Sequence, residues 1–129
     1  MKKPSILLVD DEVAFANNLL KLMSKRGYDI VVVYNGADAV NMVGEKEFDV
    51  IILDMKMPGM DGIATLKEIK KKAPLVEVVI LTGHGSVESG IEGMQLGAFD
   101  FLMKPVSIDD LQEKVSEAYQ RKLIQRESG

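Results

Sequence analysis

The stretch Val50-Ile-Ile-Leu-Asp-Met-Lys-Met-Pro-Gly-Met-Asp-Gly62 decides the fold. Its first four residues are aliphatic, which predicts a short strand buried on both faces, as in a parallel sheet. The apolar run stops at Asp54, and the Pro58-Gly59 pair then prevents a helix from continuing. A carboxylate directly after a buried strand is costly unless it has partners. We therefore expect Asp54 to be the working residue and other strand ends to supply its partners.

Composition describes one ordinary globular domain. The chain has 129 residues, of which 47% are hydrophobic and 28% charged. We expect a single domain over residues 1–129, with a core from about 5 to 123 and a polar C-terminal tail at 124–129; from Arg121 onward the chain is expected to fray. The absence of cysteine excludes disulfides and thiolate metal sites.

Charge and hydropathy indicate which cellular location and which binding partners to expect. A net charge of −4 argues against nucleic acid as a direct partner. No apolar run reaches membrane-spanning length, and the N-terminus lacks the apolar core of a signal peptide. A cytoplasmic location, with no membrane partner, is the expectation.

Apolar periodicity divides the chain into alternating strands and helices. Strands are predicted at 5–9, 28–34, 50–53, 76–81 and 98–103, and helices at about 13–26, 35–44, 63–73, 86–96 and 107–120. Such alternation predicts an α/β domain with a parallel sheet and right-handed crossovers. Gly90 and Gly93 weaken the fourth helix, and Lys70-Lys-Lys72 is interpreted as a solvated helix face.

Polar residues follow four of the five predicted strands. They are Asp10-Asp11, Asp54, Thr82 and Lys104. Parallel sheets bind ligands beyond the carboxyl ends of their strands, so these residues are the candidate site. Close carboxylates repel by roughly 4 kcal/mol per pair at an effective dielectric constant near 20. A hard cation with oxygen ligands relieves this repulsion, and Mg²⁺ fits best.

The residues of this group can have a structural role or a catalytic one. Taken alone, Asp10 could equally be the N-cap of the following helix. Together with Mg²⁺, however, one carboxylate can act as a nucleophile that forms an aspartyl-phosphate, and a hydroxyl and an ammonium can bind the phosphoryl oxygens. Thr82 and Lys104 supply those two groups.

The sequence also resembles a known family, the receiver domain of bacterial two-component response regulators. The resemblance runs from Ile6 to about Leu123. It is carried by Leu8-Val-Asp-Asp-Glu12, Leu53-Asp-Met-Lys-Met-Pro-Gly-Met-Asp-Gly62, Leu81-Thr-Gly83 and Gly97-Ala-Phe-Asp-Phe-Leu-Met-Lys-Pro105. It implies a flavodoxin-like, doubly wound sheet of five parallel strands, in the order 2-1-3-4-5, flanked by five helices.

By the same resemblance, Asp54 would accept a phosphoryl group from a sensor histidine kinase or phosphotransfer protein. Asp10, Asp11 and Asp54 would hold Mg²⁺ together with the backbone carbonyl of Lys56. Thr82 and Lys104 would contact the phosphoryl group, and the Lys104–Pro105 peptide would be cis. The domain would catalyse its own phosphorylation and dephosphorylation without being a turnover enzyme on an external substrate.

The family's switch pairs the hydroxyl after strand four with an aromatic residue on strand five, here Phe101. Many relatives have tyrosine at this position; phenylalanine leaves only ring burial. The surface of helix four, strand five and helix five would change on phosphorylation. Glu12 is expected at the rim, where it favours the first turn of its helix. His84 and Lys56 could influence water access to the phosphoryl group.

Other functions remain open at this point. A hydrolase of the haloacid dehalogenase type carries Asp-x-Asp after strand one, whereas Asp54-Met-Lys lacks the second acid and follows strand three. A flavodoxin-like cofactor binder would need a hydroxyl- and glycine-rich phosphate loop after strand one, where Asp10-Asp11-Glu12 would repel a phosphate. A receiver-like interaction module that never binds phosphate usually lacks one of the site residues, and none is missing here. The last motif looks like receivers that precede ATPase-type transcription activators, so a downstream output domain or effector is a candidate partner. Helix four could support a phosphorylation-dependent homodimer.

Overall fold

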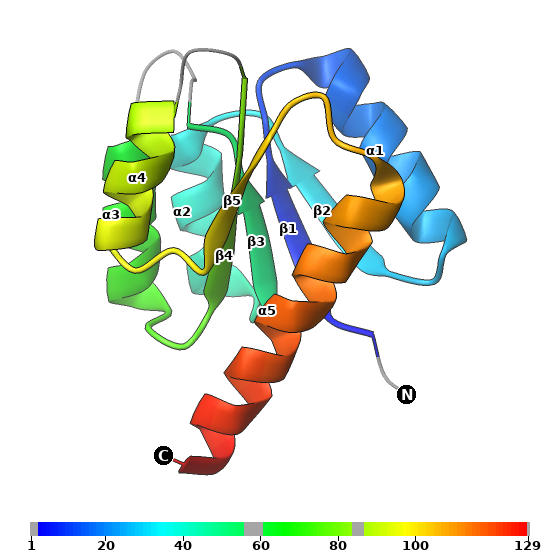
Figure 1. The fold of residues 1–129 in the computed structure, drawn as a ribbon. Coiled ribbons are helices and arrows are strands. Elements are labelled where there is room, and N and C mark those ends of the chain that lie inside the picture. Colours follow the sequence, from blue (N-terminus) through cyan, green and yellow to red (C-terminus); the bar gives the residue numbers. More distant parts are fainter. Residues whose placement is uncertain (1–2, 56–60, 84–86, 129) are drawn as a thin grey trace.

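Five strands alternate with five helices in the computed structural model, which describes residues 3–55, 61–83 and 87–128 (Figure 1). Tight capping sets several helix starts: Asn35, Asp61 and Ser107 accept hydrogen bonds from the amides of Asp38, Ala64 and Asp110. In chain order the elements are β1 (Ser5–Val9), α1 (Val13–Lys25), β2 (Asp29–Val33), α2 (Gly36–Glu45), β3 (Val50–Leu53), α3 (Gly62–Lys72), β4 (Glu77–Thr82), α4 (Val87–Gln95), β5 (Asp100–Met103) and α5 (Ile108–Ser128).

The strands form one parallel sheet in the order β2-β1-β3-β4-β5, which confirms the predicted topology. The central strand, β3, is apolar along its whole length, and its neighbour β1 is apolar after Ser5, because both faces of the sheet are covered. Strands β4 and β5 begin slightly later than predicted, at Glu77 and Asp100.

Helices cover both faces of the sheet. α1 and α5 lie against one face, and α2, α3 and α4 lie against the other (Figure 1). Alternate residues of β1 separate accordingly: Ile6 and Leu8 pack toward α1 and α5, whereas Leu7 and Val9 pack toward the other three helices. The carboxyl ends of all five strands therefore meet at one edge of the sheet, the upper edge in Figure 1.

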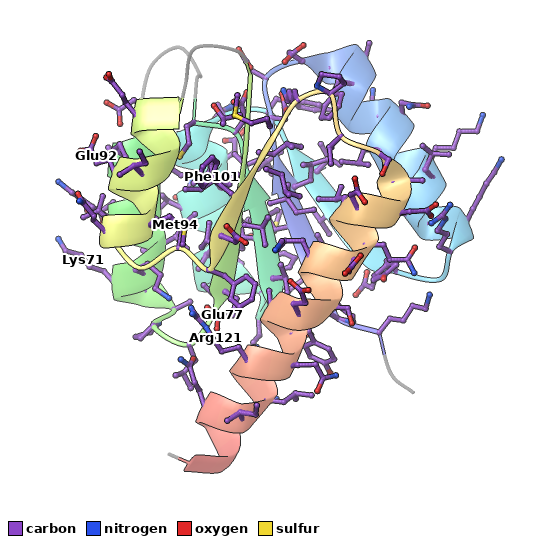
Figure 2. All side chains as sticks on the ribbon, viewed as in Figure 1. Lys71, Glu77, Glu92, Met94, Phe101 and Arg121 are labelled. Atoms are coloured by element: carbon purple, nitrogen blue, oxygen red, sulfur yellow. The ribbon has the colours of Figure 1, made fainter. Side chains whose placement is uncertain are left out.

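The glycines of α4 allow this helix to approach the sheet closely. A Cβ at Gly90 would lie 2.9 Å from the ring of Phe101, and one at Gly93 would lie 2.1 Å from Cδ1 of Ile80. Glycine costs helix stability, as the sequence indicated, but here it also makes room for the side chains of β4 and β5. The ring of Phe101 is consequently packed under the backbone of α4 (Figure 2).

We predict that Gly90→Ala destabilises the domain. The methyl group would displace the Phe101 ring, at a cost of about 1–3 kcal/mol, and the gain in helix propensity of about 1 kcal/mol offsets only part of this. Gly44→Ala in α2 is the matched control, because its Cβ would meet nothing closer than Nζ of Lys72 at 3.6 Å. Urea unfolding should show a net loss for Gly90→Ala and none for Gly44→Ala; equal effects would contradict this packing.

The end of the chain differs from the sequence-based expectation. α5 does not fray at Arg121 but continues through Ser128, below the edge of the sheet (Figure 1). Arg121 donates two hydrogen bonds to the carboxylate of Glu77, which is 1% exposed, and the two side chains point toward each other in Figure 2. Nζ of the buried Lys122 donates to Oδ1 of Asp49, at 2.8 Å, and to the carbonyl of Phe48. The prediction of a frayed tail failed because these polar residues bind buried acceptors at the base of the sheet.

The interpretation of Lys70-Lys-Lys72 as a solvated face was wrong for its first member. Lys70 is half-buried, and its Nζ donates to the carbonyls of Pro74 and Val76 at 3.1 and 2.9 Å. Burial lowers the pKa of Lys70; the negative charge of Glu77 opposes this shift, and the positive charge of Arg121 adds to it. Lys70 therefore closes the turn between α3 and β4, while Lys71 stays exposed.

We predict that Arg121→Met lowers the free energy of unfolding by about 2–3 kcal/mol, because it leaves the buried Glu77 carboxylate without its bidentate partner. Arg126→Met is the control: Arg126 contacts Glu47 at 3.4 Å with both side chains exposed, so its loss should cost less than about 0.5 kcal/mol. Chemical denaturation measures both. If the two variants were equally stable, the interaction between α5 and β4 would not contribute as described.

Candidate functional site

Asp54 lies directly after β3 at the carboxyl edge of the sheet. Its amide donates to the carbonyl of Val9 at 2.9 Å, which continues the β1–β3 ladder by one residue and fixes the start of the side chain. The residue is 4% exposed. The aliphatic run that the sequence begins with thus delivers a carboxylate to a buried position at the sheet edge, as predicted.

Asp10 is fully buried at the end of β1. Its amide donates to the carbonyl of Val33 in the direction of β2, and its Oδ1 accepts a hydrogen bond from the amide of Glu12 at 2.9 Å. The N-cap of α1 is Glu12 rather than Asp10, and the Glu12 side chain makes no capping hydrogen bond. Asp10 therefore fixes the turn into α1 while its other oxygen, Oδ2, faces Lys104 at 2.9 Å.

Lys104 follows β5 and brings a cation to these carboxylates. Its amide donates to the carbonyl of Thr82 at 2.7 Å. Its Nζ lies 2.6 Å from Oε1 of Glu12, 2.9 Å from Oδ2 of Asp10 and 3.9 Å from Oδ2 of Asp54. Nζ also lies 4.4 Å from the ring centroid of Phe15, within range of a cation–π contact. The Lys104–Pro105 peptide is cis, as expected.

The carboxylates keep Lys104 protonated. Burial lowers the pKa of its ammonium, but hydrogen bonds to Glu12 and Asp10, together with the charges of Asp10 and Asp54, outweigh burial and raise the pKa above 10.5. Lys104 is thus a permanent positive charge at neutral pH.

Thr82 ends β4 and is completely buried. Its hydroxyl has no hydrogen-bond partner among the residues that the structure describes. A buried hydroxyl without a partner is unfavourable, so this group is available to a ligand that reaches the sheet edge.

Three carboxylates converge on the site. One oxygen from each of Asp10, Glu12 and Asp54 can lie within 4.8 Å of the others, a spacing suited to one metal ion. An all-oxygen donor set is the kind that Mg²⁺ prefers. Asp11 is half-buried and is not part of this cluster, whereas Glu12, expected only at the rim, is. The sequence shows three adjacent acids, and no pattern in it decides which of them face Asp54.

The remaining candidate residues are placed as follows. Phe101 lies on β5 with its ring half-buried against α4. Lys56 and His84 lie outside the described residues. Asp10, Asp54 and Lys104 are brought together, and Thr82 joins Lys104 through the backbone hydrogen bond between β4 and β5.

Comparison with known proteins identifies the family. Residues 6–116 match the response regulator receiver domain. The chain belongs to this family. The receiver domain is 44% identical over 116 residues to "Transcriptional regulatory protein ZraR" of Salmonella typhimurium. The aligned region covers 90% of this chain and 26% of that protein. It is 36% identical to "DNA-binding transcriptional regulator NtrC" of Escherichia coli, in an alignment that covers 85% of this chain and 24% of that protein.

Solved structures agree. The receiver domain superposes on a response regulator receiver domain protein from Clostridium thermocellum with a TM-score of 0.89 and 36% identity, covering 94% of this chain and 98% of that one. NtrX from Brucella abortus gives a TM-score of 0.92 with 30% identity, covering 98% of this chain and 29% of that one.

Membership of this family indicates the functional class of the receiver domain. It is a module of two-component signalling, and its acidic pocket of Asp10, Glu12 and Asp54 is consistent with a phospho-accepting aspartate. The chain spans about a quarter of the length of the curated relatives it matches, and those relatives are named as transcription regulators. Within the described residues, no helix combines the length and apolar character needed to span a bilayer.

The raised pKa of Lys104 leads to a prediction about pH. Because its pKa is higher in the folded protein than in the unfolded chain, the stability that Lys104 contributes is fully present below pH 10.5 and is lost as the pH rises through the folded-state value. The difference in unfolding free energy between wild type and Lys104→Met should therefore be constant from neutral pH to about pH 10 and shrink above it.

Urea unfolding in metal-free buffer across this range measures that difference. Lys67→Met, an exposed position on α3, is the control and should show no such pH dependence. A difference that stays constant up to pH 11.5 would contradict the proposed charge pairing (about one unit above the usual lysine pKa).

Proposed function

We propose that this receiver domain accepts a phosphoryl group on Asp54 from the phosphohistidine of a sensor histidine kinase or phosphotransfer protein. The observation that carries the proposal is the buried Thr82 hydroxyl, which has no partner among the described residues, on the strand adjacent to Asp54. With the Lys104 ammonium 3.9 Å from Asp54 Oδ2, this provides a donor and a cation for phosphoryl oxygens.

The transfer is a direct displacement. One carboxylate oxygen of Asp54 attacks phosphorus, a new O–P bond forms, and the P–N bond to the donor histidine breaks. The electron pair of that bond stays on the imidazole nitrogen, which takes a proton from solvent. Lys104 and Thr82 hydrogen-bond the phosphoryl oxygens, so that charge is neutralised without a general acid from the protein.

A metal ion fits the oxygen donors of this site. Mg²⁺, when bound, neutralises the carboxylates and the phosphoryl oxygens and aligns them for displacement. We propose Asp10, Asp11 and Asp54 as the carboxylates that hold it, with the carbonyl of Lys56. The close grouping of Asp10 and Asp54 supports this assignment, and the position of Glu12 makes it a further candidate.

The consequence of phosphorylation is a change at the surface formed by α4, β5 and α5. Thr82 would turn toward the phosphoryl group, and the ring of Phe101, which lies on the adjacent strand under Gly90, would move into the space that this opens. Phosphorylation can favour the second state only because it contacts Thr82 and Lys104 differently in the two states.

The relatives support a proposal for the biological role. We propose a cytoplasmic signalling switch, not a turnover enzyme, that controls a transcriptional output domain or effector without touching nucleic acid or membrane itself. The exposed side chains of Ile91 and Met94 on α4 support a phosphorylation-dependent homodimer through this helix.

Incubation with acetyl phosphate tests the proposal. We expect intact mass and peptide mapping to show one phosphoryl group on Asp54 in the presence of Mg²⁺. The adduct should be absent after chelation and absent in Asp54→Asn. Thr82→Val should slow its formation by about tenfold or more, since a donor to the phosphoryl group is lost.

Thr65→Val is the matched control for Thr82→Val. Thr65 is equally buried, but its hydroxyl donates to the carbonyl of Asp61 in α3, away from the site. It should leave the phosphorylation rate unchanged. No adduct in the wild-type protein under any condition would overturn the phospho-acceptor proposal and favour a phosphate-independent interaction module.

A further inference from the structure

Glu12 makes the shortest contact to the ammonium of Lys104. Its Oε1 lies 2.6 Å from Nζ, although 62% of the Glu12 side chain is exposed. The backbone around it is fixed, because its amide donates to Asp10 and its carbonyl accepts from Ala16. The side chain is thus a largely solvated carboxylate on a rigid base, bound to the one cation in the acidic cluster of the described residues.

The contacts of Lys104 hold its ammonium away from Asp54. Its Nζ donates a hydrogen bond to Oε1 of Glu12 at 2.6 Å and forms an ion pair with Oδ2 of Asp10 at 2.9 Å. Asp54 Oδ2, at 3.9 Å, is beyond hydrogen-bonding distance, and the ring of Phe15 lies on a further side of the ammonium. In this state Lys104 is paired with the carboxylates at the start of α1.

We propose that Glu12 is a positioning residue that serves as the resting-state counter-ion of Lys104 and is displaced when Asp54 is phosphorylated. This inference rests on the proposed function, because the displacing group is the phosphoryl group on Asp54. Asp10 cannot serve as the exchangeable partner, since it is fully buried and its Oδ1 accepts a hydrogen bond from the amide of Glu12. Glu12 can leave, because water is available to its carboxylate.

Charge decides the direction of the exchange. A phosphoryl group adds about −1.5 to −2 charges and is bound in a buried site, whereas the Glu12 carboxylate has a single charge that solvent screens. The ammonium therefore gains by moving to the phosphoryl oxygens. Glu12 raises the energy barrier of that step, because its contact with Lys104 must be broken first.

Substitution of Glu12 should lower the energy barrier to moving the Lys104 ammonium toward the phosphoryl group. We expect Glu12→Gln to raise the rate of phosphorylation by subsaturating acetyl phosphate about three- to tenfold, the equivalent of one partly exposed charge-assisted hydrogen bond. Glu12→Asp should act in the same direction, because its shorter side chain retains the charge but loses the contact. Glu45→Gln, an exposed acid on α2, controls for net charge.

Two readouts separate contact from simple repulsion of the anionic donor. The rates are compared in high salt, where long-range repulsion is screened. The ¹⁵Nζ resonance of Lys104 is recorded without metal or donor, and it should shift in Glu12→Gln and Glu12→Asp but not in Glu45→Gln. In the wild-type protein, phosphorylation should shift the Glu12 carboxyl resonance to the position of a solvated glutamate.

Each other outcome overturns the inference. Phosphorylation of Asp54 at unchanged rates in both Glu12 variants would show that Glu12 does not restrain Lys104. An increase in Glu12→Gln alone would assign the effect to donor repulsion. Absence of any adduct in the wild-type protein would instead remove the proposed function, and the exchange with it.

Discussion

The ammonium of Lys104 is the interaction on which the carboxyl edge of the sheet depends. Carboxylates from the ends of β1 and β3 and from the start of α1 lie close together, and each close pair repels by roughly 4 kcal/mol at an effective dielectric constant of about 20. Lys104 offsets this repulsion through its side chain, while its amide hydrogen-bonds the carbonyl of Thr82. A single residue thereby joins β5 to β4 and to α1, and the geometry of the candidate site follows from it.

Much of this arrangement was predictable from the sequence, because strand ends are marked by abrupt changes from aliphatic to polar residues. The run before Asp54 reveals a buried strand, and the alternation of strands and helices places Asp10, Asp54, Thr82 and Lys104 at one edge. Local residue types also suit the observed helix ends: Ser107 caps α5, and Gly27, which has a φ of 93°, follows α1.

What the sequence could not predict depends on side-chain direction and on distant partners. Asp11 and Glu12 are neighbouring acids, and only the turn into α1 determines that Glu12 reaches Lys104. Lys70 and Arg121 look like surface residues in any local pattern, yet both bind acceptors in or near β4. Gly90 looks like a weak point of its helix until the ring of Phe101 is seen beneath it.

The ion pairs of α5 also define how short the domain can be. Arg121 and Lys122 neutralise Glu77 and Asp49, which lie at the starts of β4 and β3, at the opposite edge from the candidate site. A fragment ending before residue 121 would retain the apolar side of α5 but leave two carboxylates at the base of the sheet without these cations. We therefore expect the folding unit to extend at least to Lys122, three residues beyond Tyr119, the last residue of α5 that packs against this core.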